Sequence, residues 1–225
     1  MRSFMRCARL VACALLIPSL SSAVPPRRSV DVVAPPRDAS APRSVAVYLH
    51  GLGDVPDGGC WYFGRAVGDR TWLVCPRAPV SYGPGAAWSS PASTRTAVAR
   101  AIDAAEQRGP GTVDRATPGV LVGFSQGAYA AQQLLRTQPG RWRGVAFVAA
   151  HIRWTRAQLE AAGVRRAVFA ATRGDMMRPV LMETARRLQA EGFAARFVDL
   201  GRGGHSCVAR GETSWTEVLA WLDEA

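Results

Sequence analysis

The sequence contains no lysine and no asparagine, so all 28 of its basic residues are arginine. Only 17 acidic residues oppose them, which leaves a formal net charge of +11. A basic surface can favour anionic partners. A complete absence of lysine, however, indicates a bias of the coding sequence more than a selected binding face, and no basic stripe carries interleaved aromatic residues. We therefore predict no nucleic-acid partner.

Long apolar runs are also missing. The run at residues 10–20 is interrupted by Pro18 and is shorter than the roughly 20 residues that span a bilayer, so no stable membrane span is predicted. Arginines precede the run and small residues follow it, which indicates a signal peptide over residues 1–23. We expect an exported protein, periplasmic or secreted. A lipoprotein anchored at Cys13 is disfavoured, because the apolar run follows that cysteine instead of leading up to it.

Cysteine is scarce, and two of the five cysteines fall in the leader. The remaining three are Cys60, Cys75 and Cys207, and an odd number allows at most one internal bridge. Cys60 with Cys75 is the plausible pair in an oxidising compartment. Three small buried residues without any bridge fit the sequence equally well.

The rest of the chain divides into a lead-in and one domain. Residues 24–43 are rich in proline and arginine and show no apolar period, which is typical of a flexible tether. Residues 44–225 are long enough for one hydrophobic core, which favours a single domain. In that domain, short β-branched runs alternate with stretches of helical period, the pattern of a mostly parallel, doubly wound α/β sheet.

The predicted strands cover residues 45–49, 71–75, 120–124, 144–148, 167–171 and 195–200. The predicted helices cover residues 94–107, 126–138 and 179–191, and Ser214 is expected to cap a final helix. Right-handed crossovers would place the ends of these strands, and the loops that follow them, along one rim of the sheet. We therefore look for functional residues in those loops.

The strongest local signal is Gly123-Phe124-Ser125-Gln126-Gly127, between a predicted strand and a predicted helix. This context is typical of a nucleophile elbow, in which a serine occupies the tip of a sharp, strained turn. Side chains at positions 123 and 127 would clash with the neighbouring strand and helix. The turn also directs the hydroxyl to the N-terminus of the helix, where negative charge is favoured. The pattern predicts Ser125 as a nucleophile.

A serine nucleophile needs a base to accept its proton. His205 lies in a glycine-rich loop after the last predicted strand, where the chain order of such folds places the base, so we prefer it to His50 and His151. A carboxylate should orient the imidazole. Asp175 fits because it follows a predicted strand, whereas its rival Asp199 lies inside one.

Acyl transfer also needs N–H donors for the oxyanion, one after the nucleophile and one in a loop after an early strand. Gln126 supplies the first, and Leu52 is predicted to supply the second. His50 and Asp54 are expected to brace that loop by hydrogen bonds. The three histidines share no ligand spacing such as i, i+4, so no metal site is predicted.

These residues resemble the phospholipase/carboxylesterase branch of the α/β-hydrolases, which includes acyl-protein thioesterases and small bacterial carboxylesterases. The likeness runs from residue 44 to the C-terminus. Its motifs are Leu49-His50-Gly51-Leu52-Gly53-Asp54, Cys75-Pro76-Arg77-Ala78-Pro79, Gly123-Phe124-Ser125-Gln126-Gly127, Gly174-Asp175 and Gly204-His205. The resemblance implies a triad of Ser125, Asp175 and His205, oxyanion donors at Leu52 and Gln126, and no cofactor. No insertion is large enough for a lid, which predicts an open cleft.

The expected activity is hydrolysis of a carboxylic ester or thioester through an acyl-enzyme on Ser125. The partner would be a small-molecule or lipid-like ester, with Trp88 and His151 near its acyl group. The exported leader argues against lipidated cytosolic proteins as substrates. Other interpretations stay open: a hydrolase-fold binding protein without turnover, a polyester depolymerase, a dienelactone-type hydrolase or a peptidase.

Overall fold

A computed structural model describes residues 32–34, 36, 41–210 and 214–224. The predicted signal peptide, residues 1–23, lies outside this part of the chain. Within it, a central sheet has seven strands in the order β1-β3-β2-β6-β7-β8-β9. These strands are β1 Val32–Ala34, β2 Val45–Leu49, β3 Trp72–Cys75, β6 Gly119–Phe124, β7 Trp142–Val148, β8 Arg166–Ala171 and β9 Ala195–Asp199. All neighbouring pairs are parallel except β1 with β3.

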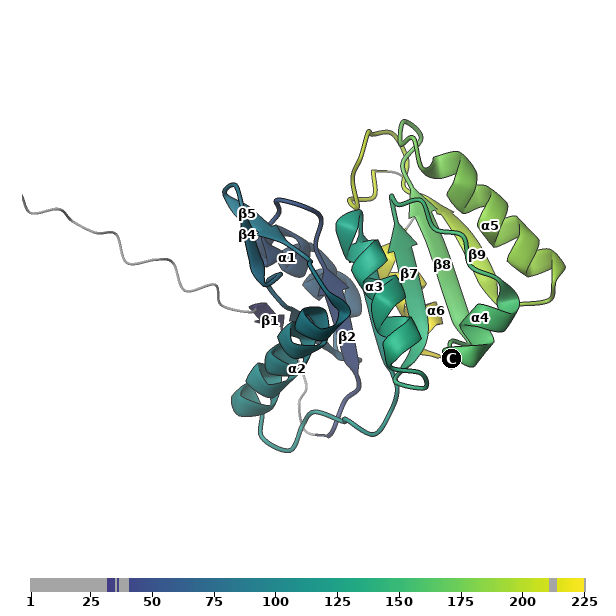
Figure 1. The fold of residues 1–225 in the computed structure, drawn as a ribbon. Helices are drawn as coiled ribbons and strands as arrows, with labels where there is room; N and C mark the ends of the chain where they lie inside the picture. The colour runs from purple at the N-terminus through teal and green to yellow at the C-terminus, as the bar shows by residue number, and fades with distance from the viewer. Residues whose placement is uncertain (1–31, 35, 37–40, 211–213, 225) are drawn as a thin grey trace, which may run out of the picture.

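Helices cover both faces of this sheet (Figure 1). They are α1 Pro56–Val67, α2 Pro91–Arg108, α3 Gln126–Thr137, α4 Arg156–Ala161, α5 Arg178–Ala190 and α6 Trp215–Asp223. Helices α2, α3, α4 and α5 contribute to one buried apolar cluster, and α1 and α6 contribute to the other. Because strand side chains alternate between faces, Val45 and Val47 of β2 enter the first cluster and Ala46 and Tyr48 enter the second. No helix in the described ranges is both long and apolar enough to cross a membrane.

The lead-in predicted as a tether is partly a strand. Val32–Ala34 pairs antiparallel with β3, with Val32 opposite Cys75 and Ala34 opposite Leu73. The local sequence gives no sign of this strand because its backbone partners lie some forty residues further along the chain. The prediction of a flexible tether over residues 24–43 is therefore wrong at these three residues.

Two further elements differ from the sequence-based expectation. A small hairpin, β4 Val80–Tyr82 and β5 Gly85–Ala87, follows β3 and was not predicted. The final helix begins after Ser214 as expected, but the Ser214 side chain makes no capping hydrogen bond. The helix is instead fixed by burial of Trp215, Leu219 and Leu222.

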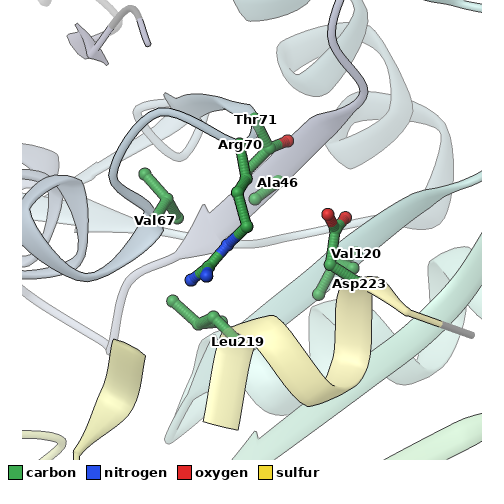
Figure 2. Close-up of a pocket in the computed structure, with 7 residues that line it drawn as sticks. All are labelled: Ala46, Val67, Arg70, Thr71, Val120, Leu219 and Asp223. Atoms are coloured by element: carbon green, nitrogen blue, oxygen red, sulfur yellow. The ribbon is translucent and has the colours of Figure 1, made fainter. Parts of the chain in front are cut away.

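A polar network closes the amino-terminal end of the sheet. The nearly buried Arg143 donates hydrogen bonds to the Pro118 carbonyl, the Asp223 carboxylate and the Ser44 hydroxyl. Beside it lies a hollow of about 10 Å³, bordered by Arg70 and Asp223 (Figure 2). Such a volume holds about one water molecule. The hollow is too small for an ester substrate and lies at the opposite end of the strands from Ser125.

Candidate active site

Ser125 occupies the turn between β6 and α3 with φ 53° and ψ −117°, a conformation that L-residues rarely adopt. The Ser125 N–H donates to the Val148 carbonyl at 2.9 Å, which ties the strained turn to β7. A Cβ added at Gly123 would lie 2.5 Å from the Gly127 carbonyl oxygen. A Cβ added at Gly127 would overlap the Leu49 carbonyl oxygen. The two glycines are therefore required for this turn, as the sequence predicts.

The structure brings the predicted base and acid to this serine. His205 Nε2 lies 2.8 Å from Ser125 Oγ, and His205 Nδ1 lies 3.0 Å from Asp175 Oδ2. The Asp175 side chain is 1% exposed, whereas that of His205 is 52% exposed. With the proton on Nδ1, the imidazole donates to the buried carboxylate and accepts from the serine hydroxyl. This arrangement can withdraw the hydroxyl proton during attack.

The loops that carry the acid and the base are fastened to one another. The Gly174 N–H donates to the Gly203 carbonyl at 2.9 Å, and the Thr172 hydroxyl donates to the same oxygen at 2.8 Å. The Met177 N–H donates to Asp175 Oδ1 at 2.8 Å, which leaves Oδ2 directed at His205. The position of His205 therefore depends on backbone contacts as well as on the carboxylate.

Asp199, the alternative acid, is engaged elsewhere. Its Oδ2 accepts from Arg178 at 3.1 Å and from Arg173 at 3.2 Å, and its Oδ1 accepts from the Gly201 N–H at 2.8 Å. Burial opposes its ionisation, but these three donors outweigh that effect and lower the pKa of Asp199. Its role in the structure is to pair with arginines at the end of β9, whereas Asp175 is the carboxylate that accepts the hydrogen bond from His205 Nδ1.

The loop expected to supply an oxyanion donor packs against the serine. A Cβ added at Gly51 would lie 3.1 Å from the Phe124 ring, which is a tight contact, and 3.5 Å from the Ser125 Cβ, which is an ordinary van der Waals distance. The N–H groups of Gly53 and Asp54 are already bonded, to Ala86 and Gly51. Within the described residues, the N–H groups of Leu52 and Gln126 have no protein acceptor. Both therefore remain available as hydrogen-bond donors, and their role toward an oxyanion stays a prediction.

His50 braces this loop. It is fully buried, its Nδ1 lies 2.8 Å from the Gly51 carbonyl oxygen, and its Nε2 accepts the Ala78 N–H at 3.1 Å. Burial lowers the pKa of His50, which keeps the ring neutral with its proton on Nδ1. The predicted brace from Asp54 is more local, because its carboxylate accepts only the adjoining Val55 N–H in this loop.

The two residues predicted near the acyl group have different surroundings. His151 is exposed after β7, where its N–H donates to the Tyr129 hydroxyl at 3.0 Å and its Nε2 accepts from Arg153 at 3.3 Å. Trp88 is only 7% exposed, and its indole is hydrogen-bonded to the His50 carbonyl. A substrate can reach His151, whereas Trp88 presents almost no surface to one.

Large exposed apolar side chains lie on segments that follow the carboxyl ends of the parallel strands, the edge of the sheet at which Ser125 lies. We define the apolar rim as six exposed residues that follow strand ends or lie in the first turn of α3: Leu52, Val80, Tyr82, Tyr129, Met176 and Val208. In the described part of the chain, only Trp61 is a large exposed apolar residue outside this rim. Sequence reasoning missed Tyr129, although it lies in the first turn of the helix that follows Ser125.

Cys207 and possible metal ligands are the alternatives to compare with Ser125 among the described residues of this edge. Cys207 lies two residues beyond His205, but burial raises the pKa of its thiol to about 11 and keeps it protonated. A protonated thiol is a weak nucleophile. Among the described residues, no three histidine, cysteine or acidic side chains gather closely enough to hold a metal ion.

No protein-family model matches this sequence, and no curated protein is significantly similar to it. Solved structures do resemble it. Esterase PE8 superposes with a TM-score of 0.58 and 19% identity, over 86% of this chain and 97% of the esterase. The Bacillus cereus carboxylesterase superposes with a TM-score of 0.57 and 15% identity, over 86% of this chain and 93% of the carboxylesterase. Acyl-protein thioesterase 2 from Zea mays superposes with a TM-score of 0.57 and 16% identity, over 86% of this chain and 97% of the thioesterase.

The shared architecture and the strand order assign the chain to the α/β-hydrolase fold, which confirms the fold predicted from the sequence. At identities of 15–19%, these similarities establish a shared fold but not a shared activity. Because one fold hosts many activities, function has to be argued from the site.

Proposed function

We propose that this chain is a serine hydrolase of the carboxylesterase and thioesterase type, with Ser125 as its nucleophile. The observation that carries the proposal is the continuous hydrogen-bonded series from Ser125 Oγ through His205 to Asp175, with distances of 2.8 and 3.0 Å. A nucleophile, a base and a buried orienting carboxylate in this order are the parts that acyl transfer requires. The similar structures, which are those of an esterase, a carboxylesterase and an acyl-protein thioesterase, support the same proposal.

The reaction proceeds in two steps. Ser125 Oγ attacks the substrate carbonyl while His205 Nε2 takes the hydroxyl proton, and the N–H groups of Leu52 and Gln126 stabilise the oxyanion. The intermediate collapses, and His205 passes its proton to the departing alcohol or thiol. Water then attacks the acyl-enzyme, His205 accepts a proton from it, and Ser125 recovers that proton as the acid leaves. Asp175 stabilises the imidazolium in both steps.

The surroundings of the serine favour an ester with an apolar acyl group. The apolar rim offers exposed leucine, tyrosine and methionine side chains at the edge of the sheet that carries Ser125, and burying such surface contributes about 25 cal/mol per Å². Small-molecule or lipid-like esters meet this requirement.

We also propose that the protein works outside the cytoplasm. The leader at residues 1–23 has the features of a signal peptide. The described domain holds a disulfide between Cys60 and Cys75, which suits an oxidising compartment. An exported location separates the site from lipidated cytosolic proteins.

The proposal is tested by measuring hydrolysis of p-nitrophenyl esters from acetate to palmitate with the purified chain. Ser125→Ala should lower kcat by about 10⁴-fold or more, because the nucleophile is lost. Ser81→Ala, at an exposed serine of β4, serves as the matched control and should keep full activity. Parental rates in Ser125→Ala would refute the proposal.

A further inference from the structure

Trp88 makes hydrogen bonds to both of the segments that carry the proposed oxyanion donors, Leu52 and Gln126. On one side, its indole Nε1–H donates to the His50 carbonyl at 2.9 Å, two residues before Leu52. On the other side, its backbone N–H donates to Gln126 Oε1 at 3.0 Å, and Gln126 Nε2 donates to its carbonyl at 3.2 Å. The Gln126 side chain thus pairs with the Trp88 backbone through both of its polar atoms.

Further bonds fasten the same two segments together. The Gly53 N–H donates to the Ala86 carbonyl at 2.9 Å, and the Ala86 N–H donates to the Asp54 carbonyl at 3.0 Å. The His50 and Trp88 rings also pack together, with centroids 5.3 Å apart. The loop that carries Leu52 is therefore held before and after that residue by the strand of Ala86 and by Trp88.

We infer that Trp88 is a positioning residue that fixes the Leu52 and Gln126 N–H groups relative to one another. The inference rests on the proposed function, since it concerns the oxyanion in that reaction. Donors stabilise an oxyanion strongly only when they are preorganised at hydrogen-bonding distance. The Leu52 loop has glycine on both sides of the donor, so its own backbone offers little rigidity. Trp88, which is buried and uncharged, supplies the rigidity from outside.

The inference separates transition-state stabilisation from substrate binding. Removing one oxyanion donor outright costs about 10²–10³ in kcat, so loosening a donor should cost about 10–100-fold. Trp88 has little exposed surface, so KM should change by less than about threefold, the pattern of an interaction made in the transition state. A merely structural tryptophan would instead lower stability or the fraction of active molecules.

The experiment uses the full chain with Trp88→Phe, which removes the indole donor but keeps an aromatic ring. The matched control is Trp72→Phe. The Trp72 indole donates to the Thr112 backbone carbonyl at 3.0 Å. Trp72 is also buried, but it lies at the start of β3, at the opposite end of the strands from Ser125. Each variant is measured for kcat and KM on p-nitrophenyl butyrate and for inhibition by a trifluoromethyl ketone. Active sites are titrated with a fluorophosphonate, so that rates refer to competent enzyme.

We expect Trp88→Phe to lose about 10–100-fold in kcat, with a parallel rise in the Ki of the ketone, whose adduct places an oxyanion between the donors. Trp72→Phe should change neither value per active site. Gln126→Glu, which replaces the amide donor facing the Trp88 carbonyl by a carboxylate oxygen, provides a second route if Trp88→Phe does not fold. It should show the same loss.

The outcomes are distinct. If the wild type is active and Ser125→Ala is inactive, parental values of kcat and Ki in Trp88→Phe would overturn this inference and leave the proposed function standing. Where only Gln126→Glu folds, parental values in that variant would have the same meaning. Equal losses in Trp88→Phe and Trp72→Phe would reduce Trp88 to a structural residue and also overturn it. A wild type that neither hydrolyses esters nor reacts with the fluorophosphonate would remove the proposed function and this inference together.

Discussion

Asp175→Asn would test the assignment of the acid. The carboxylate accepts from His205 Nδ1 at 3.0 Å and from the Met177 N–H at 2.8 Å, and its side chain is 1% exposed. In an asparagine, the Met177 contact holds the amide oxygen, so the NH₂ group faces His205. The imidazole must then accept at Nδ1 and carry its proton on Nε2, where it can no longer act as a base toward Ser125. Burial leaves little room for water to replace the lost acceptor.

The expected loss is about 10⁴-fold in kcat, the size seen when a triad histidine is held in the wrong tautomer. That factor corresponds to about 5 kcal/mol of transition-state stabilisation. The assay is p-nitrophenyl butyrate hydrolysis at about pH 8, with protein folding checked by circular dichroism. Asp199→Asn is the control, and its rate should stay within about threefold. The assignment would be refuted if kcat of Asp175→Asn stayed within about tenfold of the wild-type value. It would also be refuted if Asp199→Asn lost as much kcat as Asp175→Asn.

Replacing Cys60 and Cys75 by serine should lower the free energy of unfolding by about 3 kcal/mol, because the bridge closes 15 residues; an unchanged urea midpoint would contradict this. Gly127→Ala should give unfolded or insoluble protein because its Cβ meets carbonyl oxygens at the end of β2, whereas Gly58→Ala, with open space, should fold. Burial lowers the pKa of His50, so its neutral form contributes stability above about pH 6.5 that is lost as the pH falls toward the lowered pKa. In His50→Gln, stability measured in urea should therefore fall less between about pH 7.5 and 5.5.

Sequence periodicity was sufficient for the six parallel strands, because all of them except the edge strand β9 are largely apolar runs that are buried on both faces. The strand at residues 45–49 was predicted to the residue, and the others within two residues. The periodic signal failed where structure depends on distant backbone partners. Strand β1 exists through its pairing with β3, and β4 and β5 are three-residue strands that pair with each other, with one further bridge from Ala86 to Asp54. Such short segments carry too few side chains to show a period.

The site was predictable where chemistry constrains residue type, and unpredictable where backbone geometry does. Ser125, His205 and Asp175 could be found because the elbow, the chain order and the strand ends restrict them. The contacts of Trp88 could not, because they run from its indole to the His50 carbonyl and from the Gln126 side chain to the Trp88 backbone. Neither the His50 carbonyl nor the Gln126 side chain gives a sequence pattern that identifies it as a partner of Trp88. The sequence therefore led to the prediction that Trp88 contacts the substrate.

The most direct test of the central claim is the site of covalent labelling. The purified chain is treated with a fluorophosphonate, digested and analysed by mass spectrometry, with Ser125→Ala treated in parallel. If Ser125 is the activated nucleophile, the adduct will lie on Ser125 alone and will be absent from the variant. No adduct would favour a hydrolase-fold binding protein without turnover. An adduct on another residue, or one that persists in Ser125→Ala, would contradict the assignment of Ser125 as nucleophile.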